Sequence, residues 1–232
     1  MREQPWHLRR LSTEHYLWYR NLLDLHALTR EWLNELKLNG NPPRLIERTH
    51  PAYPDLASEA DLNLQTLEKL LDDTDPNDLL GRLEKAIWTV QSWVLWKTKA
   101  QKRPQSELKT ILEQASWRAG RDCAHRRWKI LHPESDSIHP GDLRSILASF
   151  HDSPLSGFPK MEGFLIRRAT ATEVELQIRN CPDQQEQEGL KKEIAPFLCE
   201  LQGYWVRGFV YYFNPRVSVD RKNCRENWFL PP

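Results

Sequence analysis

Apolar side chains recur every three or four residues along most of the first 131 residues, the spacing that places them on one face of a helix. This spacing predicts long helices at residues 13–38, 80–96 and 106–131, and shorter ones near 61–71 and 140–150. A glycine and two prolines after residue 38 end the first helix, and the acidic turn 72–78 supplies an N-cap for the second. We therefore expect residues 1–103 to form an all-helical region.

After residue 160 the spacing of apolar residues changes from the helical three to four residues to an alternation of polar and apolar positions. Polar and apolar residues alternate from Glu173 to Arg179, which predicts a strand with one buried face, and a preceding strand is expected at 162–169. A helical stripe follows and is expected to end at Gly203, because glycine commonly ends helices. The run Tyr204–Phe213 is aromatic and β-branched, which predicts another strand, followed by a return near residues 217–219 and a last strand at 224–229.

Together these periods predict an α+β protein. We expect a helical N-terminal region, followed by a small α/β module whose antiparallel sheet of about four to five strands packs on a long helix. The basic, proline-ended stretch Lys97–Pro104 marks the boundary, so the predicted units are residues 1–103 and 104–232.

The composition limits the classes of binding partner and the compartment that we expect for this protein. The chain has a net charge of +1, so no global field favours nucleic acid or an anionic membrane, and its ten tryptophans are expected to fill the core. No run approaches the roughly 20 apolar residues that span a bilayer, and the N-terminus lacks the apolar core of a signal peptide, so we expect a cytoplasmic protein. Four cysteines without a CxxC pair are then expected to be thiols rather than disulfides or zinc ligands.

One helix face concentrates positive charge. Arg118, Arg121, His125 and Lys129 lie three to four residues apart, so they share a face of the helix 106–131. An anionic ligand, an acidic partner or nucleic-acid phosphate would suit this face, and a solvated stripe would give the same pattern. Gly120 lies within this helix and costs about 1 kcal/mol relative to alanine. We therefore expect close packing at Gly120.

The cysteines offer candidate chemistry. Cys181 ends the strand 173–179 and precedes a proline, at an edge of the sheet where pockets form, which makes it the candidate functional thiol. Cys224 is the candidate second member, whereas Cys123 lies on an inner helix stripe and should be inert. His125 could act as the base beside Cys123 or Cys181. Equally, the cysteines could simply be small core residues.

Ligand contacts are also predicted from the last third of the chain. We assign Trp205 and Arg207 to the ligand-binding set, together with Arg118, Arg121, Cys181 and Cys224. The sequence identifies no cofactor and no metal site. It also contains no phosphate-binding, dinucleotide-binding or hydrolase glycine motif.

Residues 104–232 resemble two related groups of small α/β proteins, the 4-vinyl reductase-like domains and the L-2-amino-thiazoline-4-carboxylic acid hydrolase-like family. The matching positions are Gly120, Asn180-Cys181-Pro182, Cys199 before Gly203, Gly208, and Cys224-Arg225-Glu226-Asn227-Trp228. The resemblance implies a ligand pocket between the sheet and the long helix and a tendency to form homodimers. For the hydrolase-like branch it also implies hydrolysis of a small heterocycle.

Three functions fit these patterns. We favour a module that binds a small molecule, suited to an anion, in a thiol-lined pocket. The alternatives are a cysteine- or metal-dependent hydrolase of a small heterocyclic substrate and a protein-interaction scaffold that acts through a dimer surface.

Overall fold

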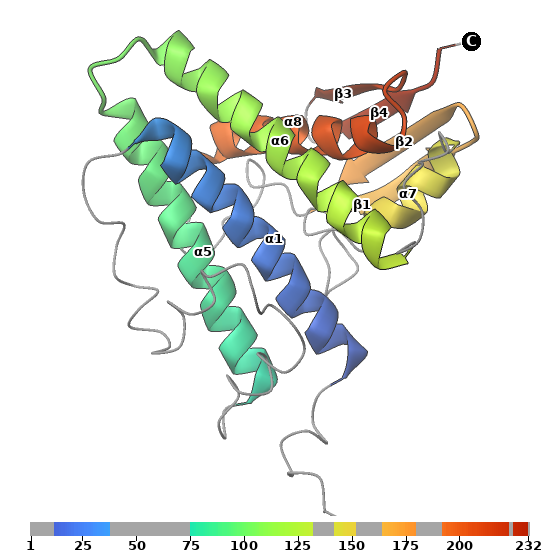
Figure 1. Ribbon diagram of the computed structural model, residues 1–232, viewed down its shortest axis with the longest axis horizontal. Helices are drawn as coiled ribbons and strands as arrows, with labels where there is room; N and C mark the ends of the chain where they lie inside the picture. Colours follow the sequence, from blue (N-terminus) through green and yellow to red (C-terminus); the bar gives the residue numbers. More distant parts are fainter. Residues whose placement is uncertain are drawn as a thin grey trace, which may run out of the picture.

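The computed structural model describes residues 12–37, 75–131, 142–151, 164–179, 192–222 and 225–231. Its helices are α1 (Thr13–Leu36), α5 (Pro76–Lys99), α6 (Gln105–Leu131), α7 (Leu143–His151) and α8 (Ala195–Phe213). Its strands are β1 (Phe164–Ala169), β2 (Glu173–Ile178), β3 (Ser218–Lys222) and β4 (Arg225–Phe229) (Figure 1). Within the described ranges, a helical N-terminal region precedes a small antiparallel sheet, and α8 lies between its strands β2 and β3, so the predicted α+β fold is confirmed.

Helices α1 and α5 begin at side-chain caps. Ser12 accepts a hydrogen bond from the backbone N–H of His15, and the His15 side chain accepts one from the Ser12 backbone, which completes a capping box. At the start of α5 the carboxylate of Asp75 accepts from the backbone N–H groups of Asn77, at 2.9 Å, and Asp78, at 3.3 Å. The N-cap expected within the acidic turn is therefore present.

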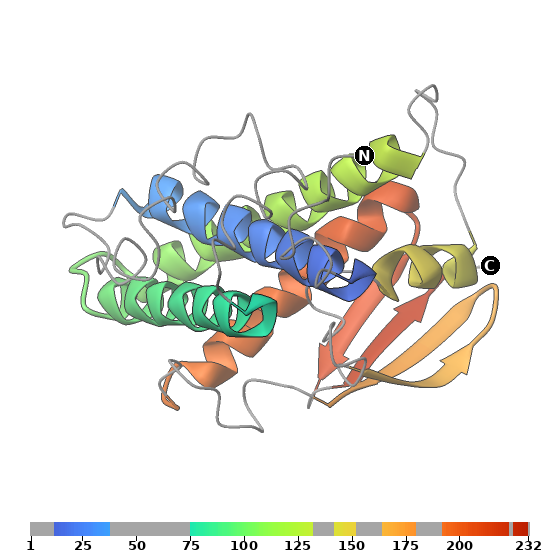
Figure 2. The ribbon, with the colours of Figure 1, turned by 90° about the horizontal axis from the view of Figure 1, so that it is seen from below.

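The sheet is antiparallel in the order β1-β2-β4-β3. Val174 lies opposite Trp228, and Leu176 lies opposite Glu226, and all four side chains are buried. Helix α7 contacts β2 and helix α8 contacts β3, so these two helices cover the buried face (Figure 2). Neighbouring residues such as Glu175 and Asn227 point to the other face, as the pleat requires.

The predicted strand Tyr204–Phe213 is wrong, because these residues form the second half of α8, and the helix does not end at Gly203. The helix packs between α6 and the sheet, so apolar residues cover two of its sides and leave only a narrow exposed stripe. Within residues 204–213 only Arg207 is charged, and the aromatic and β-branched content of this run favours a strand. Glu200, Tyr204, Arg207 and Tyr211 nevertheless recur every three or four residues and are not buried, which is the period of a helix.

Helices α6 and α8 touch through their backbones. A Cβ atom added to Gly120 would lie 1.9 Å from the carbonyl oxygen of Trp205, and one added to Gly208 would lie 1.9 Å from that of Trp117. No side chain fits at either position, so the contact requires glycine on both helices. The close packing expected at Gly120 is therefore present, and α8 provides its partner.

One hydrophobic cluster joins side chains from every described helix to the sheet. Trp32 of α1, Trp205 of α8 and Trp228 of β4 are all buried within it, and the indole N–H of Trp32 donates to the Ser116 hydroxyl at 2.9 Å. A smaller cluster fills the space between α1 and α5. The main core thus includes residues on both sides of position 104. Among the described helices, none has the length and apolar character to cross a membrane.

Replacing Gly120 or Gly208 with alanine should lower the free energy of unfolding by about 3 kcal/mol or more, because each new methyl group would force the helices apart. Gly81 is the matched control, since a Cβ there meets nothing within 4 Å. Gly81→Ala should stabilise the protein by about 1 kcal/mol. Urea unfolding of the three variants measures this, and equal effects at Gly81 and Gly120 would contradict the backbone contact.

Candidate functional site

The predicted basic face lies on the outer side of α6. Arg118 pairs with Glu35 of α1 at 2.5 Å, and Arg121 pairs with its neighbour Asp122 at 2.9 Å. The side chains in both pairs are 35–48% exposed, so each pair contributes at most about 1 kcal/mol to stability. The carboxylate of a binding partner can therefore replace that of Glu35 or Asp122 at little cost in free energy.

Aromatic side chains lie beside this basic face. The guanidinium of Arg121 lies 5.5 Å from the ring centre of Trp117, which contacts the ring of Tyr211 edge-on at 5.2 Å. Nδ1 of His125 lies 2.8 Å from the hydroxyl oxygen of Tyr212, and Tyr211 is 45% exposed. We name these five residues of α6 and α8 the aromatic–basic surface.

The remaining predicted ligand contacts lie elsewhere. Trp205 is buried and stacks on Phe209 within the core. Arg207 donates from Nε to the carbonyl of Val219 at 3.1 Å, and its guanidinium lies over the Tyr204 ring, so it connects α8 to β3. Neither residue contributes to the aromatic–basic surface. Cys181 and Cys224 lie outside the described residues.

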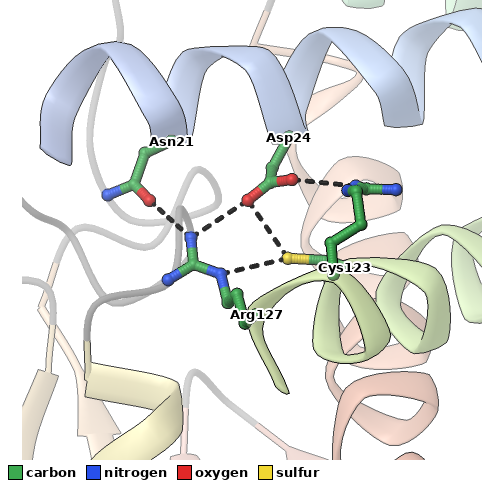
Figure 3. Close-up of polar contacts among 5 residues, drawn as sticks. Asn21, Asp24, Cys123 and Arg127 are labelled. Atoms are coloured by element: carbon green, nitrogen blue, oxygen red, sulfur yellow. Dashed lines mark hydrogen bonds and ion pairs between the residues drawn. The ribbon is translucent and has the colours of Figure 1, made fainter. Parts of the chain in front are cut away.

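Cys123 is completely buried and points towards α1 (Figure 3). Its thiol donates to Oδ2 of Asp24 at 3.1 Å, and Nε of Arg127 donates to its sulfur at 3.3 Å. Burial and the negative charge of Asp24 raise the pKa of this thiol, which therefore stays protonated. His125 bonds with Tyr212 instead, so these contacts do not pair it with Cys123 as a base.

Asp24 is the centre of a buried polar cluster that joins α1 to α6 (Figure 3). Its carboxylate accepts from Arg126 at 2.8 Å and from Arg127 at 3.0 Å, and Arg127 also donates to Oδ1 of Asn21 at 2.8 Å. Burial alone would raise the pKa of Asp24, but the charges of Arg127 and Arg126 outweigh it and lower that pKa. The cluster therefore holds a charged carboxylate and fixes the register of α1 on α6.

Sequence reasoning missed this cluster, although a signal was present. Asp24 lies between Leu23 and Leu25 in a helix whose apolar residues were placed in the core, and Arg127 lies one turn after Cys123. A charge close to a buried stripe needs a partner, because an unpaired buried charge is costly. Two such charges of opposite sign on neighbouring helices predict an ion pair.

Comparisons with protein families, with curated proteins and with solved structures give no match to this chain. The resemblance to 4-vinyl reductase-like and hydrolase-like proteins therefore stays a prediction. What the described residues provide is a largely buried cluster in which Asp24 pairs with two arginines, and an open surface of aromatic and basic groups. Only the second is accessible to a partner.

Replacing Asp24 with alanine should lower the free energy of unfolding by about 3–5 kcal/mol, because Arg127 would remain buried without its counter-charge. The control is Asp122→Ala, which removes a carboxylate from an exposed pair and should change stability by less than about 1 kcal/mol. Equal losses in the two variants would contradict the importance of the buried cluster.

The same carboxylate should make stability depend on acid pH. Because the pKa of Asp24 is lower in the folded protein than its ordinary value of 3.8, its contribution is complete above that value. The contribution is lost as the pH falls through the lower folded pKa. The stability difference between wild type and Asp24→Asn should therefore be constant from pH 5 to 7 and shrink at pH 3, as urea unfolding at each pH would measure.

Proposed function

We propose that this is a binding protein which recognises an acidic segment of a partner protein through the aromatic–basic surface of α6 and α8. The observation that carries the proposal is the exposed contact among Arg121, Trp117 and Tyr211. Tryptophan, tyrosine and arginine are the side chains that contribute most to binding energy at protein interfaces. Here all three types occur together on rigid helices.

The backbone contact supports this assignment. Gly120 and Gly208 hold the two helices at a fixed separation, so Trp117 and Tyr211 stay in position before a partner arrives. A surface that is already ordered loses less conformational entropy on binding. Arg121 supplies a planar donor group that can hold a carboxylate with two hydrogen bonds, while the tyrosine and tryptophan rings provide apolar contact area.

The shape of the surface favours a macromolecular partner. Small-molecule sites are concave, whereas these residues lie on the outer sides of two helices. The hydrolase alternative needs Cys181, which lies outside the described residues, because Cys123 is buried and protonated, as expected of an inert thiol. The thiol-lined pocket depends on Cys181 and Cys224 and stays a prediction.

The test uses the full chain and a fluorescent copolymer of glutamate and tyrosine, with binding followed by fluorescence anisotropy. Wild type should bind this copolymer and not a lysine–tyrosine copolymer. The double variant Arg118→Glu/Arg121→Glu changes Arg121 of this surface and the arginine three residues before it on the same helix. It should bind the copolymer at least about tenfold more weakly, since two attractive charges become repulsive. Its melting temperature should change by only a few degrees, because both pairs are exposed.

The matched control is Lys102→Glu/Arg103→Glu, which makes the same change in net charge at two exposed residues beyond α5. This variant should bind the copolymer as wild type does. Equal weakening in both double variants would show a general charge effect and contradict the proposed surface. Loss of folding in the Arg118/Arg121 variant alone would show that the basic face is structural.

A further inference from the structure

A second buried ion pair lies on the opposite side of α8, between that helix and the β3–β4 hairpin. Nη1 of Arg221 lies 3.3 Å from Oε2 of Glu226, and their side chains are only 6% and 1% exposed. The other carboxylate oxygen accepts from the indole N–H of Trp228 at 2.9 Å. The guanidinium is therefore held firmly from one side.

The other end of this guanidinium faces α8. Nη2 of Arg221 donates to Oε1 of Gln202 at 3.3 Å and to the sulfur of Cys199 at 3.4 Å. Gly203 makes room for the arginine, because a Cβ there would lie 3.0 Å from its Cδ. A polar chain thus runs from Trp228 in the core, through Glu226 and Arg221, to the thiol.

One donor in this chain has no acceptor. Nε of Arg221 is buried and has no hydrogen-bond partner among the described residues. Nε and Nη2 lie on the same edge of the planar guanidinium, the edge that binds two oxygens of an anion side by side. A buried N–H without an acceptor is costly, so an oxygen bound next to the sulfur would be favoured there.

The two cysteines in the described part of the chain differ in access. Cys123 is buried, whereas Cys199 is partly exposed. The positive charge of Arg221 also stabilises negative charge on that sulfur as it attacks an electrophile. Cys199 is therefore partly exposed, lies beside the cation of Arg221, and has the N–H of that residue's Nε, which lacks an acceptor, next to it.

We propose that Cys199 is a site of oxidation by hydrogen peroxide to sulfenic acid, and that the added oxygen accepts a hydrogen bond from Nε of Arg221. The sulfur forms a bond to one peroxide oxygen while the O–O bond breaks. Sulfur loses two electrons to the peroxide, and the second oxygen leaves as water with the thiol proton. The product places a new acceptor beside Arg221, at the junction between α8 and the β3–β4 hairpin.

The experiment treats the full chain with a small excess of peroxide in the presence of dimedone, which traps sulfenic acid, and maps each cysteine peptide by mass spectrometry. The Cys199 peptide should gain the dimedone adduct while the Cys123 peptide stays unlabelled. Arg221→Lys keeps the charge but loses the two-donor edge, and should label at Cys199 about tenfold more slowly.

The control is Arg216→Lys, which makes the same substitution at an exposed residue before β3 and should label as wild type does. Circular dichroism of each variant shows whether it folds. If Arg221→Lys does not fold, the ratio of Cys199 to Cys123 labelling in wild type decides the question. No adduct at Cys199 in folded wild type, or equal labelling rates in wild type and folded Arg221→Lys, would overturn the proposal.

Discussion

The backbone contact between α6 and α8 is the constraint on which the rest of the structure depends. Gly120 and Gly208 each lie against the backbone of the other helix, at a separation that excludes any side chain. The two helices can therefore cross this closely only where both have a glycine. Their contact fixes the positions along the two helices at which Trp117 contacts Tyr211 and His125 contacts Tyr212. The aromatic–basic surface is therefore a consequence of the helix crossing.

Two buried charge clusters lie on either side of this helix pair. Asp24 connects α1 to α6 through Arg126 and Arg127, and Glu226 connects the hairpin to α8 through Arg221. A buried ion pair often contributes little net stability compared with apolar packing, yet breaking it is costly. We interpret both clusters as devices that specify which surfaces of the helices meet. If the helices or strands that a cluster joins were to shift, that cluster would leave a buried charge without its partner.

The two described thiols have different surroundings, because each lies beside a different one of these clusters. Cys123 lies under α1, where Asp24 accepts a hydrogen bond from its thiol and where no solvent reaches it. Cys199 lies at the margin of α8, where Arg221 donates to its sulfur. One thiol acts as a hydrogen-bond donor within a structural cluster, and the other is an acceptor at an accessible position. Sequence position alone could not distinguish them, because the partners come from residues 99 and 22 positions away.

By itself the sequence determined the elements whose period was clear. The helices α1, α5 and α6, the strands β1 and β2, an N-cap within the acidic turn and the need for close packing at Gly120 all follow from local spacing and composition. Tertiary structure decided α8, because packing between α6 and the sheet gives it apolar residues on two sides and leaves only the narrow polar stripe of Glu200, Tyr204, Arg207 and Tyr211. It also decided the partners of Gly120, Asp24 and Arg221, since contacts between distant segments depend on how helices pack and not on local pattern.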